Sequence, residues 1–509
     1  MNIAEILPRT AKRLPDKTAF VFNDQPTNYK TLQVLTEAFA HGLQKLGVKK
    51  GDRVAVFAPS SLEFVVSWFS AVKLGAVFVP VNIMLKARES KYILENAEVN
   101  TLIVHQSQGE IIQSIRPGLK FLKNVITIGA QPLPGSLLFS ALLAERPGRE
   151  IIVDCAPEDT ATMIYTSGTT GFPKGAMITH ANLYSNVPGI IEAFHLDENM
   201  IRVSVTPLFH AMGLTVNMLA VTMLGATAII QAKLDFEEFL KANEKYRATV
   251  ISGAPALHYM LAYDPRTERY DLSSWKAAIS GSAPLPAEVL RKFEEKFKIP
   301  MIEGYGLTEV TTAATSNPVF RVRKPGSVGL PFADLEVKIF DEEDREVPAG
   351  EVGEVVIRGP AVMKGYYNNP EATAETLKGG WLHTGDLGKV DEEGYVYILD
   401  RKKDMIICSG YNVYPREIEE LLHTHPGVLE AAVIGIPDPK RGESPMAFII
   451  PRPGTKVTEP ELIQFCRDNL AAYKAIKAVK FMEEFPRNPN RKVLKRELRE
   501  MVAASERKG

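Results

Sequence analysis

The first 150 residues alternate between segments with helical spacing of apolar side chains and short runs of continuous apolar residues. Helical spacing covers Tyr29–Leu46, which ends before Gly47, and Leu62–Leu74. Apolar runs typical of buried strands cover Arg53–Ala58 and Val77–Val81. Strands that alternate with helices predict largely parallel sheets covered by helices. We therefore expect an α/β fold in this part of the chain.

The pattern changes after Gly326. Short strands such as Leu335–Phe340, punctuated by Gly, Pro and Asp, predict a small β-rich subdomain over residues 326–400. Beyond the charged run Asp400–Asp404, charged helices such as Glu459–Asn469 surround the strand Glu430–Ile436. We expect a large N-terminal domain, 1–400, built on parallel α/β sheets, and a small α+β C-terminal domain, 401–509.

One uncharged stretch could be mistaken for a membrane span. Val203–Ala232 contains no Asp, Glu, Lys or Arg, and is long enough to cross a bilayer. Pro207 interrupts it, and Gly225 lies where a helix should stop. We interpret the stretch as a buried helix at about Met212–Leu224 followed by a buried strand, and we expect no transmembrane segment.

Length, charge and cysteine usage narrow the class of protein. A chain of 509 residues is too long for one core and predicts at least two domains. A formal net charge of -1 gives no composition-level case for nucleic acid or an anionic membrane as partner. Cys155, Cys408 and Cys466 form neither a disulfide framework nor a metal-ligand spacing. We expect a reducing, cytoplasmic setting.

The segment with the clearest candidate chemistry is the loop Tyr165–Gly175, which follows the buried apolar segment Ala161–Ile164. Hydroxyl residues and glycines fill Thr166–Gly171, and Lys174 follows. Glycine leaves backbone N–H groups accessible, so such a loop can bind phosphate at a strand end. It is not a Walker loop, because Pro173 stands where the second glycine belongs. A plain turn is the alternative.

Two further clusters of residues are weaker evidence for a functional site when each is taken alone. In Glu303–Glu309, glycines flank Tyr305, whose ring could lie against adenine, and Glu309 suits magnesium beside phosphates. A carboxylate such as Asp386, next to a glycine, could accept hydrogen bonds from a ribose. Each could equally be an ordinary turn. His210 lies in an apolar stretch, where a lone histidine is most often a core residue, and no second ligand suggests a metal site.

Taken together, and in this order, these motifs resemble the acyl-adenylate-forming superfamily of acyl- and aryl-CoA ligases, adenylation domains and beetle luciferases. The resemblance covers nearly the whole chain. It implies two steps: a carboxylate attacks the α-phosphorus of ATP to give acyl-AMP and pyrophosphate, and the thiol of coenzyme A then takes the acyl group. It also implies Mg²⁺.

The resemblance implies roles for individual residues. The β- and γ-phosphates of ATP would be held by Thr166, Ser167, Gly168, Thr169, Thr170, Gly171 and Lys174. The remaining nucleotide-binding residues would be Gly281, Ser282, Ala283, Glu303, Gly304, Tyr305, Gly306, Thr308, Asp386 and Arg401, with Tyr305 against adenine, Thr308 on the α-phosphate and the last two on the ribose. Mg²⁺ would lie at Thr166 and Glu309.

It also implies an acyl site, a moving domain and a coenzyme A site. The acyl group would lie beside Phe209, His210, Met212 and Gly213. Lys492 would bridge the carboxylate and the α-phosphate. Lys403 would be the hinge about which the C-terminal domain rotates, bringing Ser409, Gly410 and Tyr411 to the active site for coenzyme A. The chain departs from the family at Arg491, where glycine is usual.

The leading hypothesis is a free-standing acyl-CoA ligase for a medium- or long-chain aliphatic acid, suggested by the apolar segment Ala211–Leu224. An aryl-CoA ligase of benzoate or coumarate type is the alternative within the class, since an aromatic acid also needs an apolar pocket. An adenylation enzyme that loads a carrier protein is the alternative outside it. The expected partners are small molecules, and the sequence leaves a homodimer open.

Overall fold

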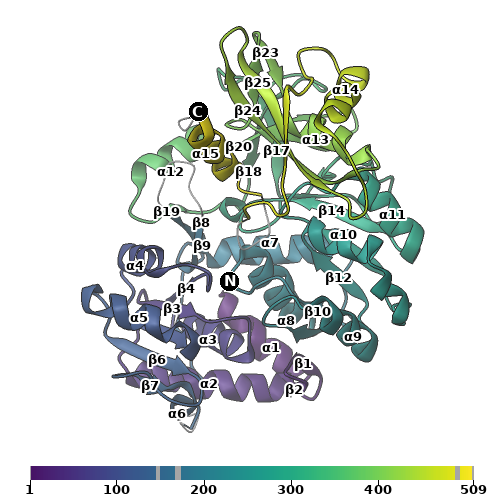
Figure 1. Cartoon of the computed structure of the whole chain (residues 1–509). Coiled ribbons are helices and arrows are strands. Elements are labelled where there is room, and N and C mark those ends of the chain that lie inside the picture. Colours follow the sequence, from purple (N-terminus) through teal and green to yellow (C-terminus); the bar gives the residue numbers. More distant parts are fainter. Residues whose placement is uncertain (1, 145–149, 167–172, 488–492, 507–509) are drawn as a thin grey trace.

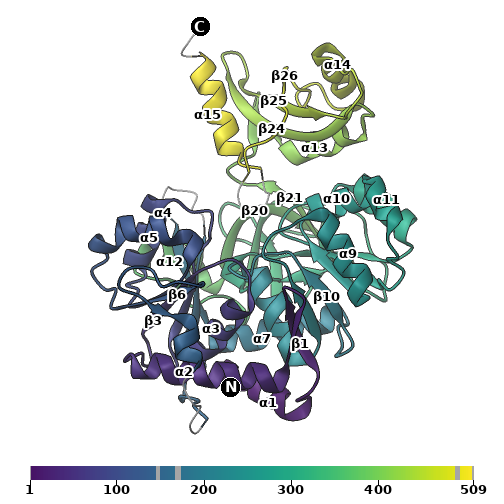
Figure 2. The same ribbon diagram turned by 60° about the horizontal axis from the view of Figure 1, so that its bottom comes forward.

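A computed structural model describes residues 2–144, 150–166, 173–487 and 493–506 of the chain (Figure 1). It has a large N-terminal domain of sheets and helices and a small C-terminal domain, as the sequence predicts. Figure 2 shows the C-terminal elements α13, α14, α15, β24, β25 and β26 grouped at one end of the molecule, above β20 and β21.

The first sheet has eight strands in the order β19-β9-β8-β4-β3-β5-β6-β7. Its strands are β3 (Arg53–Phe57), β4 (Val77–Pro80), β5 (Thr101–His105), β6 (Asn124–Ile128), β7 (Leu137–Leu138), β8 (Thr160–Thr166), β9 (Lys174–Thr179) and β19 (Gly365–Tyr366). The pairs from β8 to β7 are parallel, whereas β9 is antiparallel to both β8 and β19. Its helices are α2 (Tyr29–Lys45), α3 (Leu62–Lys73), α4 (Ala87–Asn96), α5 (Gly109–Ile115) and α6 (Phe139–Leu143).

The prediction of a largely parallel sheet is confirmed, and the antiparallel edge adds to it. Lys174–Thr179 forms β9, which pairs antiparallel with β8 as the second strand of a β-hairpin. The loop still follows a buried strand, because Ala161–Ile164 lies within β8 and is buried.

The second group of strands has the orders β10-β11-β1-β2 and β12-β13-β14-β15-β16. The two sets meet where the Thr249 N–H donates to the Ile201 carbonyl at 2.7 Å. The strands are β1 (Thr18–Phe22), β2 (Gln25–Asn28), β10 (Ile201–Ser204), β11 (Thr227–Ile230), β12 (Val250–Gly253), β13 (Ala277–Ser280), β14 (Met301–Tyr305), β15 (Thr315–Ser316) and β16 (Leu330–Pro331). The helices are α1 (Ile6–Arg13), α7 (His180–Ala193), α8 (Ala220–Leu224), α9 (Phe236–Tyr246), α10 (Pro255–Tyr263) and α11 (Ala287–Phe297).

The uncharged stretch lies in the core, as predicted. It includes the end of β10 (Ile201–Ser204), a π-helix η4 (Gly213–Leu219), α8 and β11. Gly225 adopts φ +78° directly after α8, where a side chain would be strained. None of the helices that the structure describes combines the length and the hydropathy needed to span a bilayer.

The β-rich subdomain is an antiparallel sheet of β17 (Glu336–Phe340), β18 (Gly353–Arg358), β20 (Leu382–Val390) and β21 (Val396–Arg401). Between β18 and β20 the chain leaves this sheet, adds β19 to the first sheet and forms α12 (Pro370–Thr376). This excursion joins the subdomain to the hairpin of β8 and β9.

The C-terminal elements are β22 (Ile406–Cys408), β23 (Tyr411–Val413), α13 (Pro415–Thr424), β24 (Val428–Asp438), β25 (Gly442–Pro451), α14 (Glu459–Asn469), β26 (Ala478–Phe481) and α15 (Lys495–Glu506). Strands β22 to β26 form one sheet, and β21 belongs to the preceding one. The change of sheet therefore falls between Arg401 and Ile406. A boundary at Asp400 with a hinge at Lys403 stays a prediction.

Candidate active site

Four side chains meet where the β8–β9 hairpin faces the segment after β14. The Thr166 hydroxyl donates to Glu309 Oε1 at 3.4 Å, and the Tyr366 hydroxyl donates to the same oxygen at 2.7 Å. The Lys174 ammonium lies 5.0 Å from the centroid of the Tyr366 ring. A cation, a carboxylate and a hydroxyl are thus held together at the base of the predicted phosphate loop. Tyr366 was not predicted.

Part of the predicted phosphate site lies outside the described residues. This holds for Ser167, Gly168, Thr169, Thr170 and Gly171, and also for Lys492. The structure describes both ends of the loop, at Thr166 in β8 and Lys174 in β9, which are paired in register. It also describes both sides of the Lys492 segment, where Arg487 and Val493 form an isolated bridge.

A second cluster joins β14 to the β-rich subdomain. The Tyr305 hydroxyl donates to Asp386 Oδ2 at 2.6 Å, and Arg401 Nε lies 2.6 Å from Asp386 Oδ1. Asp386 and Arg401 are cross-strand partners on β20 and β21. Burial, reinforced by the Asp386 carboxylate, raises the pKa of Tyr305 well above its ordinary value, so the phenol stays protonated and keeps donating. The structure thus brings together three predicted nucleotide-binding residues.

The predicted adenine segment lies beside the glycines of β14. A side chain on Gly281 would contact the Gly304 carbonyl at 3.5 Å, so the two backbones are close. Ser282 adopts φ +71°, in the left-handed region. A side chain on Gly306 would overlap the Thr312 carbonyl oxygen. Gly306 is therefore required for the chain to fold back after β14 and present Thr308 and Glu309.

Glu303, also predicted to bind nucleotide, has different neighbours. It is buried, and with Leu290, Arg323 and other residues it lines a small cleft. Burial raises the pKa of Glu303 to about 7, and the opposing influences are Arg416 and the Leu285 N–H. Arg416 belongs to α13 of the C-terminal domain. Glu303 therefore lies among residues of the N-terminal domain, and the charge of Arg416 acts on it from the C-terminal domain.

The predicted acyl residues occupy the turn that leads into η4. The rings of Phe209 and His210 lie 4.9 Å apart, and the Ser282 hydroxyl lies 3.7 Å from the Met212 sulfur. A side chain on Gly213 would overlap the Pro207 carbonyl, which explains the glycine. Burial lowers the pKa of His210 to about 4. His210 is therefore neutral at pH 7 and can border an apolar group without bringing a charge to it.

The predicted coenzyme A residues lie apart from these clusters. Ser409 and Gly410 adopt φ +53° and +81° at the turn between β22 and β23, and the Tyr411 ring stacks on Tyr473 at 4.6 Å. Figure 1 shows β23 at the end of the molecule remote from β8, β9 and β19. The structure does not bring this turn to Asp386 or Glu309.

The predicted hinge residue follows β21 directly. The Lys402 N–H donates to the Gly385 carbonyl at 2.9 Å, and Asp404 forms a 2.8 Å ion pair with Arg499 of α15. Burial lowers the pKa of Lys403. Lys403 thus lies between a residue tied to the β-rich subdomain and one tied to the C-terminal helix.

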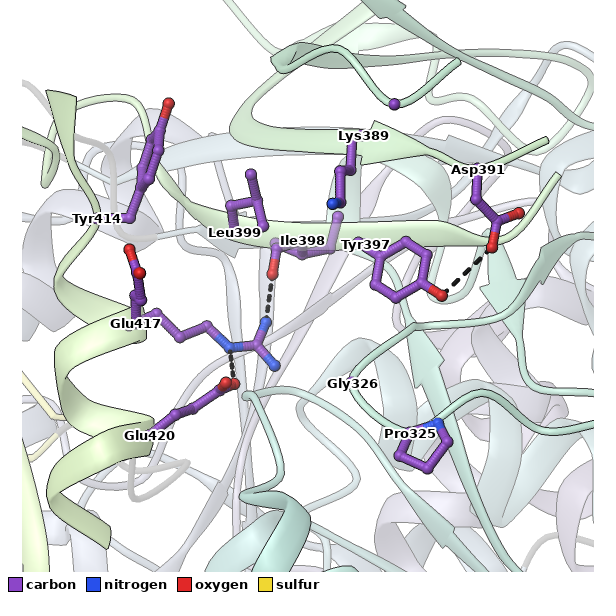
Figure 3. A pocket seen from close by; sticks show the side chains of 12 residues that line it. Pro325, Gly326, Lys389, Asp391, Tyr397, Ile398, Leu399, Tyr414, Glu417 and Glu420 are labelled. Atoms are coloured by element: carbon purple, nitrogen blue, oxygen red, sulfur yellow. Dashed lines mark hydrogen bonds and ion pairs between the residues drawn. The ribbon is translucent and has the colours of Figure 1, made fainter. Parts of the chain in front are cut away.

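A cleft of about 460 Å³ separates the β-rich subdomain from α13 (Figure 3). Arg416 crosses it, donating to the Ile398 carbonyl and pairing with Glu420. Its lining residues are Pro325, Gly326, Gly350, Lys389, Asp391, Tyr397, Ile398, Leu399, Tyr414, Arg416, Glu417 and Glu420. None of them is a predicted site residue, so this cleft is a space between domains.

Magnesium is the metal ion that the resemblance implies at Thr166 and Glu309. The described residues contain no group of three or more His, Cys, Asp or Glu side chains that could hold a metal ion by themselves. Thr166 and Glu309 do supply a hydroxyl and a carboxylate 3.4 Å apart. Magnesium beside phosphates typically takes one or two carboxylates and completes its shell with phosphate oxygens and water. The pair fits such an ion.

Two family models match the chain. The model "AMP-binding enzyme" matches residues 7–367, and the model "AMP-binding enzyme C-terminal domain" matches residues 417–492. The first range includes the cluster of Thr166, Lys174, Glu309 and Tyr366, whereas Asp386 and Arg401 lie between the two matched ranges.

Curated relatives and a solved structure match almost end to end. The chain is 38% identical to a long-chain-fatty-acid–CoA ligase of Bacillus subtilis, over 98% of this chain and 94% of that protein. It is 35% identical to a feruloyl-CoA synthase of an Amycolatopsis species, over 96% and 97%. The crystal structure of the anthranilate CoA ligase AuaEII with anthranoyl-AMP superposes with a TM-score of 0.94, at 31% identity over 99% and 98% of the chains.

Proposed function

Since the chain belongs to the AMP-binding enzyme family, we propose that its substrate is an aliphatic carboxylic acid of medium or long chain. The chain is an ATP-dependent acid–CoA ligase. The acid's carboxylate attacks the α-phosphorus of ATP, which releases pyrophosphate and leaves acyl-AMP. The coenzyme A thiolate then attacks the acyl carbon, and AMP departs with the electron pair of the broken bond.

The observation that carries the adenylation chemistry is the cluster of Lys174, Thr166 and Glu309. Adenylation brings two anions together, so positive charge must surround the phosphates. Lys174 supplies one positive charge at the end of the loop. Thr166 and Glu309 would hold Mg²⁺, which would supply two more positive charges beside the phosphates.

The nucleoside would be held by the second cluster. Asp386 and Arg401 would bind the ribose, and the hydrogen bond from Tyr305 to Asp386 fixes the orientation of the Tyr305 ring for contact with adenine. Gly281, Ser282 and Ala283 would border the adenine, with Gly304 and Gly306 leaving room. Thr308 would bind the α-phosphate. Because Asp386 lies on a paired strand, its carboxylate needs little reorganisation when ATP binds.

The C-terminal domain would serve the two steps in turn. Lys492 would bridge the acid and the α-phosphate during adenylation. Rotation about Lys403 would then withdraw it and bring Ser409, Gly410 and Tyr411 to the site for coenzyme A. The remote position of the β22–β23 turn in Figure 1 agrees with an arrangement before that rotation.

The kind of acid is proposed from the segment that carries the predicted acyl residues. Phe209, neutral His210 and Met212 lead into Ala211–Leu224, which has no charged residue. The relatives' names include a fatty acid and ferulate, so an aryl acid remains the alternative within the class. A carrier protein in place of coenzyme A is the other alternative. Three buried, unpaired cysteines support a reducing, cytoplasmic setting.

The test is acid-dependent ATP–pyrophosphate exchange with a panel of saturated fatty acids and of benzoic and cinnamic acids. A reaction without acid is the control. We expect exchange with aliphatic acids, followed by thioester formation when coenzyme A is added. Exchange with aryl acids alone would contradict the proposed substrate. Transfer to a phosphopantetheinylated carrier protein but not to coenzyme A would contradict the acceptor.

A further inference from the structure

Arg202 is an unusual residue for the interior of this protein. It lies on β10 and is 0% exposed. Its Nη1 donates to the Val216 carbonyl at 2.7 Å, but its Nε and Nη2 have no hydrogen-bond partner among the described residues. Burial lowers the pKa of Arg202 only to about 10, so the guanidinium is charged at neutral pH.

A buried charge of this kind needs an explanation. Buried cations are normally paired with an acid, because removal of a charge from water is costly. No ion pair of Arg202 with an acidic side chain occurs in the described part of the chain. One hydrogen bond to a carbonyl recovers only a small part of that cost. An apolar residue of similar volume would therefore suit a purely structural position better.

The neighbours of Arg202 present further donors. Asn217, on η4, accepts a hydrogen bond from the Ser252 hydroxyl at 3.3 Å, but its Nδ2 has no partner among the described residues. Ser204, on the same strand as Arg202, also has an unpartnered hydroxyl within the described structure. Asn217 is 0% exposed and Ser204 is 1% exposed. Arg202, on β10, and Asn217, next to the Val216 carbonyl that Arg202 contacts, therefore each carry an N–H group, unsatisfied among the described residues, of the kind that binds an anionic oxygen ligand.

The helix η4 connects this donor set to the proposed acyl site. It begins at Gly213, directly after Met212. Its Thr215 hydroxyl lies 2.8 Å from that of Thr312, three residues beyond Glu309. The backbone of Val216 on the same helix contacts Arg202, and Asn217 follows. The Ala220 N–H bonds to Thr215 in a π-helical turn, a geometry often found at functional sites.

We propose that Arg202 and Asn217 form the far end of the acyl site and bind a carboxylate at the end of the substrate remote from the reacting carboxyl group. The preferred acid is then an α,ω-dicarboxylic acid, whose apolar chain lies along η4. This inference rests on the proposed function, since it specifies the substrate of the same site. A bidentate guanidinium contact would supply the specificity, and Asn217 would add a third donor.

The experiment compares matched acids on the same enzyme. Initial rates of ATP–pyrophosphate exchange are measured for saturated monoacids and α,ω-diacids of equal chain length from hexanoate to hexadecanoate. At the best chain length, we expect wild-type kcat/KM to be at least tenfold higher for the diacid. Arg202→Met should reverse this preference by lowering the diacid value at least tenfold and raising the monoacid value. Arg291→Met, on exposed α11, is the control and should keep the wild-type ratio.

A second variant keeps the proposal testable even if Arg202→Met fails to fold. Asn217→Leu keeps Arg202 and should reduce the diacid-to-monoacid ratio severalfold, with melting temperature as the check on folding. A wild-type ratio of one or below at every chain length, or a ratio unchanged in both Arg202→Met and Asn217→Leu, would overturn the proposal. Failure of the proposed function would look different, since no aliphatic acid of either kind would then support exchange.

Discussion

The Tyr305 hydroxyl donates a 2.6 Å hydrogen bond to one oxygen of Asp386, while Arg401 holds the other oxygen at 2.6 Å. The Asp386 carboxylate is therefore fixed on both sides before any ligand arrives. Asp386→Asn removes the charge that pairs with Arg401 and replaces one of the two acceptor oxygens with an NH₂ donor. We expect kcat/KM for ATP to fall roughly 30-fold, about 2 kcal/mol. Tyr305→Phe removes one neutral donor and should cost about 1 kcal/mol, roughly fivefold. Steady-state kinetics at varied ATP measures both, and equal effects would contradict this division of roles.

Thr166 and Glu309 are expected to determine the magnesium requirement. Glu309→Gln keeps the shape of the side chain but removes the charge, so the Mg²⁺ concentration for half-maximal exchange should rise at least tenfold, about 1.4 kcal/mol. Tyr366→Phe leaves the Glu309 carboxylate in place and should change that concentration less than threefold. The measurement is a magnesium titration of exchange at saturating ATP and acid. A Glu309→Gln curve that coincides with the wild-type curve would remove Glu309 from the metal site.

Lys492 is expected to matter for one half-reaction only. Lys492→Ala should lower acyl-adenylate formation at least 100-fold, because a cation is lost where two anions meet. Thioester formation from supplied acyl-AMP and coenzyme A should stay within about threefold of wild type. Arg496→Ala, an exposed residue of α15 near Lys492 in sequence, serves as the control. If Lys492→Ala impairs both half-reactions equally, its assigned role is wrong.

Lys403 offers a test of the hinge. Proline at this position restricts φ and removes the backbone N–H, which should hinder rotation. We expect Lys403→Pro to slow thioester formation at least tenfold more than adenylation, whereas Lys403→Ala should affect both steps little. Rapid-quench measurements of the two steps separate them. Equal slowing of both steps by Lys403→Pro would place the hinge elsewhere.

Glu303 should make stability depend on pH. Its pKa is about 7 in the folded protein against an ordinary value of 4.5, so the folded state binds more protons between these values. The stabilisation that protonated Glu303 contributes is fully present below pH 4.5, and it is lost as the pH rises through 7. Glu303→Gln stays neutral and should exceed wild type in stability at pH 8 by up to roughly 3 kcal/mol, with no difference near pH 4.5.

Melting curves of both proteins at pH 4.5, 6 and 8 test this expectation. Glu295→Gln, on the exposed face of α11, controls for the loss of a carboxylate from the same region. The buried histidines shift stability equally in all three proteins, so the comparison between variants isolates Glu303. A gap between Glu303→Gln and wild type that does not grow with pH would contradict the raised pKa.

Local patterns predicted much of the fold. Tyr29–Leu46 corresponds to α2 (Tyr29–Lys45), because apolar spacing and the Asn28 cap are both local features. The strand β9 was not predicted, since its antiparallel pairing with β8 is not evident from the sequence pattern of Lys174–Thr179 alone. The expectation of a largely parallel sheet holds for the pairs from β8 to β7, and the antiparallel pairs of β9 lie at one edge of that sheet.

The candidate site also contains some residues that the sequence predicted and some that it did not. The motif residues Thr166, Glu309, Tyr305, Asp386 and Arg401 were predicted, and the structure brings them into two clusters. Tyr366 was not, because it lies 57 residues from its partner Glu309 and no local pattern links them. Arg202 stands next to the uncharged stretch, yet an arginine in a short strand usually faces water. Only the packing of η4 against β10 shows that it is buried.

The register of β20 and β21 has a consequence for the order of events in catalysis. Arg401 is the last residue of β21 and is paired with Asp386, while the proposed hinge begins two residues later. Both proposed ribose contacts are therefore on the stationary side of the rotation. In the proposed rotation, the nucleoside part of the acyl-adenylate would stay bound to Asp386 and Arg401 while the C-terminal domain turns. With the proposed rotation, the reactive intermediate would be retained between the two steps, and only the groups contributed by the C-terminal domain would change.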